Sequence, residues 1–183
     1  MPEAPAFTAV LFGLRGCLVQ AANGVPLPTP GALDSLERLR TRQVPCIWLD
    51  ELTPAQGKRL TGVLPDWLPG HPVNGCKWPA PNACWQALMN LESQCLDGCV
   101  LVSGEPRLLQ SGLNAGLWTV GLAAGEQASP QWQALSRQEQ ERARGKATLA
   151  LFGLGVHSVI DHLEALDACL ADIAQRRHKG EKP

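Results

Sequence analysis

A tight glycine loop follows an apolar run near the N-terminus, and its side chains limit the chemistry it can perform. The run Ala9-Val10-Leu11-Phe12 leads into Gly13-Leu14-Arg15-Gly16, after which the chain is apolar again. Glycine has no side chain that could attack a substrate, and a guanidinium that does not deprotonate cannot act as a base. The loop therefore offers a positive charge but neither a nucleophile nor a general base.

Two uses of this positive charge are open. Arg15, Lys77 and Ser103 could together hold a phosphate or a carboxylate without turning it over, in the crevice where open α/β sheets bind ligands. Alternatively, Arg15 pairs with Asp50 or Glu51 and seals the pocket. A bound anion would favour the first interpretation, and an ion pair between Arg15 and a carboxylate would favour the second.

Other chemistry-bearing residues carry weaker signals. Asp50 and Glu51 are adjacent, and adjacent residues of a regular element rarely point into one site, so a loop or the cap of the next helix is the simpler interpretation. His157 and His162 have no cysteine nearby at metal-ligand spacing, so we expect no metal site there.

The elements that must position these residues alternate along the chain. Uninterrupted apolar runs of the kind found in strands buried on both faces cover 7–12, 44–49, 99–103, 117–121 and 156–160. Helix starts are indicated at Thr29-Pro30, Thr53-Pro54, Ser136-x-x-Glu139 and Asp161-x-x-Glu164. This rhythm predicts one doubly wound α/β domain over 1–183 with a parallel sheet and flanking helices.

The segment 62–82 breaks the rhythm, because glycines and prolines crowd it and it has no clear helical pattern. Trp67 and Trp78 lie within it, and together with Trp48 and Trp85 they are concentrated near the candidate site residues. We expect them to fill the core, whereas an exposed cluster would mark an interface.

Composition narrows the function classes. The 183 residues carry a formal net charge of −1 and the only basic cluster is at 176–179, which favours neither nucleic acid nor a membrane surface as partner. We expect frayed termini at 1–6 and 176–183. No apolar run approaches the length of a membrane span and no signal peptide is visible, while seven cysteines without a Cys-x-x-Cys pair favour free thiols. These features predict a cytoplasmic protein.

The motifs resemble those of the haloacid dehalogenase (HAD) hydrolase superfamily, whose first motif is an apolar strand followed by Asp-x-Asp-Gly-Thr. The later motifs resemble the phosphonoacetaldehyde hydrolase branch. The most specific match is Gly112-Leu-Asn-Ala-Gly-Leu-Trp-Thr-Val-Gly121, supported by Gly155-Val-His-Ser-Val-Ile-Asp161. The resemblance covers roughly 7–175 and implies the HAD core fold.

The resemblance also implies that the catalytic positions are degenerate. Gly13 and Arg15 stand where the family has its nucleophilic and acid/base aspartates, and Gly104 stands where it has a Mg²⁺-binding aspartate. Asp50 falls where a phosphate-gripping Ser or Thr is expected, and Trp78 where an arginine is expected, with Lys77 one residue earlier. Glu105 could restore a ligand only if its turn were rebuilt.

The phosphonoacetaldehyde hydrolases also insert a helical cap between their first motif and second strand, and this cap carries a lysine that forms a Schiff base with the aldehyde. Only Val19 to about Thr29 separates the first loop from the next helix here, so we expect no cap and no counterpart of that lysine. We expect no cofactor, because the family's Mg²⁺ would lack its ligands.

The leading hypothesis is a catalytically inactive HAD-like protein that serves as a binding or regulatory module, with a protein partner or a second copy of itself as the first partner to consider. The alternative is a residual hydrolase, or a sensor of a small phosphate or carboxylate using the same crevice.

Overall fold

A parallel six-stranded sheet forms the centre of the computed structural model, which describes residues 6–75, 78–124 and 127–183. The strand order is β5-β4-β1-β6-β7-β8, and each neighbouring pair is parallel. The strands of this sheet are β1 (Ala9–Gly13), β4 (Cys46–Asp50), β5 (Gly70–Pro72), β6 (Cys99–Ser103), β7 (Trp118–Leu122) and β8 (Ser158–Ile160). All five expected strands are present, with ends that differ by no more than two residues.

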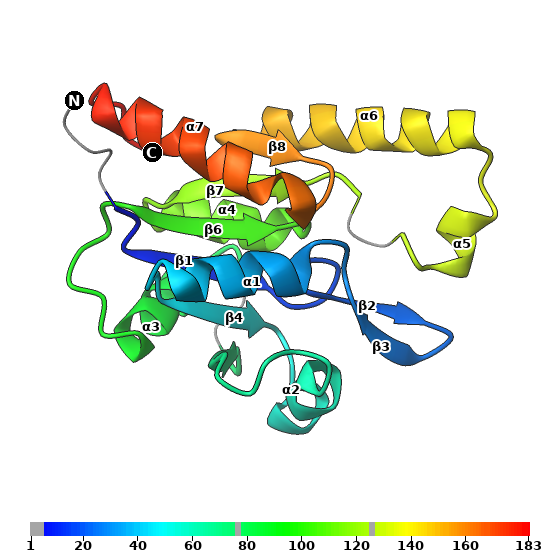
Figure 1. Ribbon diagram of the computed structural model, residues 1–183, viewed down its shortest axis with the longest axis horizontal. Coiled ribbons are helices and arrows are strands. Elements are labelled where there is room, and N and C mark those ends of the chain that lie inside the picture. The colour runs from blue at the N-terminus through cyan, green and yellow to red at the C-terminus, as the bar shows by residue number, and fades with distance from the viewer. Residues whose placement is uncertain (1–5, 76–77, 125–126) are drawn as a thin grey trace.

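Helices cover both faces of the sheet, as Figure 1 shows. They are α1 (Ala32–Thr41), α2 (Pro54–Thr61), α3 (Asn82–Asn90), α4 (Pro106–Asn114), α5 (Pro130–Gln133), α6 (Arg137–Leu154) and α7 (Leu166–His178), with a 3-10 helix at Leu163–Ala165. The strands bury side chains on both faces, which explains their uninterrupted apolar sequences. The predicted doubly wound α/β fold is confirmed.

Two large apolar clusters lie on opposite faces of the sheet, and a smaller third cluster contains Leu109 of α4 and Leu151 of α6. On one face α1 and α7 pack against alternate residues of the strands, such as Val10, Phe12 and Trp118. On the other face α3 and α4 pack against the residues between them, such as Leu11 and Leu101. This alternation follows from the opposite directions of successive side chains in a strand.

A small antiparallel hairpin stands between β1 and α1. It consists of β2 (Val19–Ala22) and β3 (Val25–Pro28), and it projects from the edge at which the parallel strands end (Figure 1). The hairpin is the whole of the regular structure in this connection, so no helical cap is inserted there, as expected.

Helix starts agree with the sequence in two cases and differ in two. Thr53 and Ser136 both form complete capping boxes, with Gln56 and Glu139. The expected start at Asp161 is wrong, because a 3-10 helix intervenes and α7 begins at Leu166. The start predicted at Thr29-Pro30 is displaced to Ala32.

The C-terminal segment is more ordered than expected. Residues 176–178, predicted as part of a frayed terminus, complete α7. Arg177 is buried at 9% exposure, and its guanidinium donates to the carbonyl of Ala6 at 3.0 Å. The prediction is therefore wrong for residues 176–178, because the buried guanidinium of Arg177 ties the end of α7 to Ala6.

Candidate functional site

The crevice lies at the carboxyl ends of β1, β4 and β6. Gly13 ends β1, Asp50 ends β4 and Ser103 ends β6, and strand register places these three ends side by side. A cavity of about 250 Å³ opens between them, lined also by Arg15, Trp78 and Glu105 among others. The fold therefore brings together Arg15, Asp50, Ser103 and Glu105, which the sequence indicated as candidate site residues.

Arg15 is held by Asp50 through three hydrogen bonds. The Arg15 backbone N–H and Nε donate to Asp50 Oδ2 at 3.0 and 2.9 Å, and Nη2 donates to Oδ1 at 2.7 Å. The Asp50 side chain is 6% exposed, whereas that of Arg15 is 54% exposed. The pairing is the one that the sealed-pocket interpretation requires.

This pairing also fixes the protonation state of Arg15. The hydrogen bond to Asp50, with the nearby charges of Asp50, Glu51 and Glu105, raises the pKa of the Arg15 guanidinium against the opposing effect of burial. Arg15 therefore stays protonated and cannot take a proton from a nucleophile.

Glu51 forms a second ion pair, with Arg107. Its Oε1 accepts from the Trp78 backbone N–H at 3.1 Å, and its Oε2 lies 3.5 Å from Arg107 Nη1. Arg107 also donates from Nη2 to the Trp78 carbonyl oxygen. The loop that begins at Trp78 is thus fastened to β4 and α4 by a carboxylate and a guanidinium.

Arg107, which the sequence patterns did not indicate, lies beside the crevice and contacts Trp78 of its lining. Its signal was its position: it stands in the first turn of α4, directly after the Ser103-Gly104-Glu105 turn, at the edge where parallel strands end. Glu105 itself caps this helix by accepting from the Arg107 backbone N–H at 3.1 Å. Lys77, predicted as an anion ligand, lies outside the described residues.

Ser103 occupies the space beside Gly13. Its hydroxyl oxygen is fully buried and accepts from the Glu105 backbone N–H at 3.0 Å. A Cβ atom added at Gly13 would lie 2.7 Å from Ser103 Oγ. A larger residue at Gly13 would therefore require Ser103 to move, whereas a Cβ at Gly104 would meet nothing closer than 3.4 Å.

Cys17 follows the glycine loop directly, and its thiol could in principle attack a substrate. Its side chain is fully buried, and Sγ donates to the Val102 carbonyl at 3.4 Å. Burial raises the pKa of the Cys17 thiol, so the nucleophilic thiolate is disfavoured. Its burial among apolar neighbours is that of a small hydrophobic residue.

The crevice does not have the donor set that Mg²⁺ prefers. That ion takes oxygen ligands in an octahedron, usually including one or two carboxylates. Gly13 and Gly104 offer no side-chain oxygen, and the carboxylate of Asp50 is already bound by Arg15. No group of three or more His, Cys, Asp or Glu residues within the described ranges could hold a metal ion.

The two candidate histidines do not line the crevice. His157 Nδ1 accepts from the Thr119 backbone N–H at 3.0 Å, and His162 lies 3.4 Å from Glu164. Trp48 and Trp78 are buried, as expected of core tryptophans, and Trp67 packs against the core with Arg40 over its ring. Trp85 is 44% exposed.

Comparisons with known proteins agree with this architecture. No family model matches the chain. It is 32% identical over 172 residues to a phosphonoacetaldehyde hydrolase of Klebsiella pneumoniae, a match that covers 85% of this chain, and 31% identical to the Salmonella enteritidis protein of the same name. The chain spans only 62% of the length of each of these two relatives.

Several solved structures are also similar to this chain. One crystal structure, 52% identical, covers 97% of this chain and is itself covered completely, with a TM-score of 0.89. A phosphonoacetaldehyde hydrolase-like protein from Oleispira antarctica is 27% identical over 86% of this chain and 60% of its own, with a TM-score of 0.73. A HAD family hydrolase from Deinococcus radiodurans, 19% identical over 93% of this chain and 97% of its own, shares the fold with a TM-score of 0.69. The chain therefore has the haloacid dehalogenase superfamily hydrolase fold and is a homologue of the phosphonoacetaldehyde hydrolases.

Proposed function

We propose that this chain is a HAD-like protein that does not hydrolyse phosphonates or phosphate esters and acts as a binding or regulatory module. The observation that carries the proposal is the Arg15–Asp50 pair beside Gly13. The strand that would present a nucleophile ends in a residue without a side chain, and the nearest charged groups are engaged with each other.

The nucleophiles near the crevice support the same conclusion. The Cys17 thiol is buried and held protonated, and no hydrogen bond links the Ser103 hydroxyl to a histidine within the described residues. A serine without an adjacent base is a weak nucleophile. Because Gly13 and Gly104 offer no side-chain oxygen and Arg15 occupies the Asp50 carboxylate, we also propose that the protein uses no Mg²⁺.

The crevice also disfavours a phosphate dianion as a tightly held ligand. Arg15 is neutralised by Asp50, and Arg107 is paired with Glu51. Glu105 adds a further negative charge to the lining. A dianion would therefore face more carboxylates than free guanidinium groups, which raises its free energy in the site.

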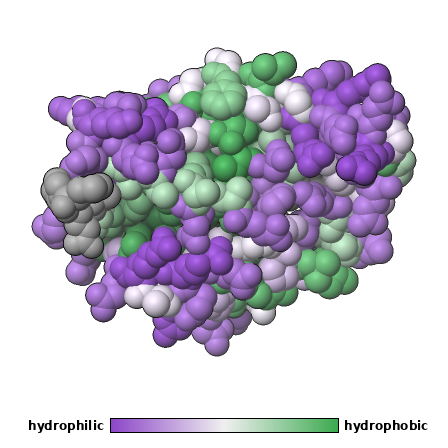
Figure 2. All heavy atoms as spheres, turned by 45° about the horizontal axis from the view of Figure 1, so that its top comes forward, coloured by the Kyte–Doolittle hydropathy of each residue, from purple (hydrophilic) through white to green (hydrophobic). Residues whose placement is uncertain are grey.

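The partner we propose is another protein molecule, and a second copy of this chain is the first to test. Leu149 and Phe152 of α6 are 75% and 53% exposed, one helical turn apart. Figure 2 shows a strip of hydrophobic side chains between hydrophilic regions of the surface. Exposed apolar side chains that gather in this way are typical of interaction surfaces.

No described helix is both long enough and apolar enough to cross a bilayer. We propose a cytoplasmic setting on the ground that the six cysteines within the described residues are free thiols.

The test is an activity assay of the purified protein with Mg²⁺, phosphonoacetaldehyde and a panel of phosphate esters. The expected result is no turnover above that of buffer. Turnover that co-purifies with the protein would overturn the proposal, and its loss in a Cys17→Ala, Ser103→Ala variant would place the nucleophile at one of these two residues. Light scattering on the same preparation measures its mass, and a monomer would contradict the second-copy partner.

A reconstructed variant provides the matched control. Gly13→Asp, Arg15→Asp and Gly104→Asp together restore the three family aspartates. Because a Cβ at position 13 approaches Ser103 Oγ, the set should be made with and without Ser103→Ala. We expect Mg²⁺ to raise the melting temperature of the reconstructed protein and to leave that of the parent unchanged.

A further inference from the structure

A second cavity lies on the other side of Arg15, between the β2–β3 hairpin and α2. Its volume is about 280 Å³. Gln20 of the hairpin and Gln56 and Arg59 of α2 contribute polar groups, while Val19, Leu52 and Leu60 contribute apolar walls. The cavity lies outside the ion-paired crevice and shares only Arg15 with it.

The charges around this cavity have one sign. Two arginines line it, and none of its lining residues is an aspartate or glutamate. The charge of Arg15 is balanced by Asp50, but Arg59 forms no ion pair and no hydrogen bond from its side chain within the described residues. Arg59 therefore supplies an uncompensated positive charge at the cavity.

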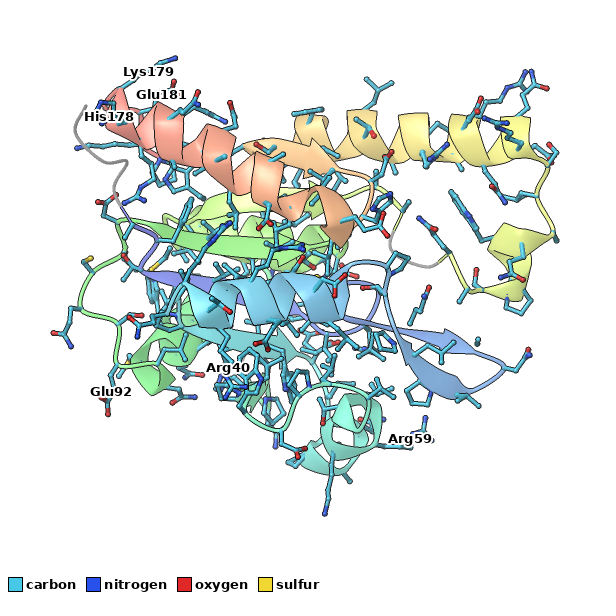
Figure 3. The ribbon with its side chains drawn as sticks, viewed as in Figure 1. Arg40, Arg59, Glu92, His178, Lys179 and Glu181 are labelled. Carbon is cyan, nitrogen blue, oxygen red and sulfur yellow. The ribbon has the colours of Figure 1, made fainter. Side chains whose placement is uncertain are left out.

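The position of Arg59 suits a ligand that enters from solvent. Figure 3 shows Arg59 on the side of α2 that lies toward the hairpin, and its residue is exposed. Leu52, by contrast, is 7% exposed, so the apolar wall lies deeper than the charge. An anionic group would meet Arg59 at the rim while an apolar body contacts Leu52, Leu60 and Val19.

We propose that this cavity is a binding site for a small aliphatic carboxylate. A guanidinium presents parallel N–H donors that match the two oxygens of a carboxylate. The volume is close to the lower end of small-molecule pockets, so the aliphatic chain must be short. The Gln20 carboxamide is already bonded to Pro28 and Ala128, and Gln56 Oε1 belongs to its capping box, so Gln56 Nε2 is the amide group left to donate to a polar substituent among the described residues. The proposal does not depend on whether the neighbouring crevice is catalytic.

The test is a titration of ¹⁵N-labelled full-length protein with butyrate, followed by NMR of the backbone amides. The expected result is saturable shifts at Leu52, Gln56 and Leu60. n-Butanol lacks the charge that pairs with Arg59, and inorganic phosphate lacks the apolar body, so each should bind at least about tenfold more weakly than butyrate.

Two neighbouring substitutions isolate the contribution of the guanidinium. Arg59→Ala should weaken butyrate binding about tenfold or more, and Lys58→Ala, which removes an equal charge from the next residue outside the cavity, should change it less than about threefold. Both positions are exposed, and urea unfolding of each variant checks that it folds. Absence of saturable shifts, equal weakening by both substitutions, or phosphate binding as tightly as butyrate would each overturn the proposal.

Discussion

At the scale of single residues, the Arg15–Asp50 pair is asymmetric in exposure, and this decides what each substitution should do. Arg15→Ala leaves the nearly buried Asp50 carboxylate without its cation and without two side-chain hydrogen bonds. We expect the free energy of unfolding to fall by about 1–3 kcal/mol, below the range for fully buried pairs because Arg15 is half-exposed. Urea unfolding at pH 7 measures this change.

A double-mutant cycle separates the pair from the rest of Arg15. If the pair carries the effect, Arg15→Ala should cost much less in an Asp50→Asn background, where no charge is left unpaired. Equal costs in both backgrounds would show that Arg15 acts through packing of its aliphatic stem instead.

The sequence could predict that Arg15 meets a carboxylate, but not which one. Asp50 and Glu51 are adjacent, and the choice depends on where β4 ends. In the register of β1 and β4, Gly13 lies opposite Leu49, so Asp50 is the carboxylate next to the loop. Arg107 escaped prediction because its partners, Glu51 and Trp78, are brought to it only by the fold.

At the scale of elements, the Trp48 side chain of β4 packs against both β5, the neighbouring strand, and the helix α2. A Cβ added at Gly70 of β5 would lie 2.0 Å from Trp48 Cε2, and one at Gly57 of α2 would lie 2.9 Å from Trp48 Cη2. The indole is 7% exposed and belongs to the apolar core. Both glycines therefore make room for one side chain.

Gly70→Ala should destabilise the protein by about 1–3 kcal/mol, because the Trp48 indole must leave its packed position. Gly145→Ala is the matched control: a Cβ there meets nothing within 4 Å on an exposed stretch of α6, so the substitution should stabilise by up to about 1 kcal/mol. Thermal unfolding of both variants checks the contrast. A Gly70→Ala protein as stable as the parent would show that the indole relocates without cost.

The burial of each strand explains whether its sequence pattern could indicate it. Strands buried on both faces produce apolar runs and were found within two residues. β5 has the sequence Gly-His-Pro and β3 contains two prolines, so neither has a pattern that indicates a strand. Their pairing with β4 and β2 places them, and that information is not local.

At the scale of the whole molecule, long-range contacts join the last strands of the open sheet to the C-terminal helix. His157 lies at the centre of one such junction. Its ring packs 4.8 Å from that of Trp118, its Nδ1 accepts from the Thr119 backbone N–H, and its carbonyl accepts from Arg176 of α7 at 2.9 Å. Sequence patterns indicated β7 and α7, but not the side chain that connects them.

This junction should make stability depend on pH. Burial, and then the charge of Arg176, lower the pKa of the His157 imidazole below its ordinary value, so the folded protein favours the neutral ring. A base whose pKa is lower in the folded state contributes stability that is complete above the unfolded pKa of about 6.5 and is lost as the pH falls below it. The free energy of unfolding should therefore decrease between pH 7 and pH 5.5, before most carboxylates titrate.

His157→Gln, which keeps a hydrogen-bond acceptor for Thr119, should be less stable at pH 7 but should lose less stability on acidification. Urea unfolding of both proteins at the two pH values measures this difference, and an equal loss in both would show that protonation of His157 does not control the junction.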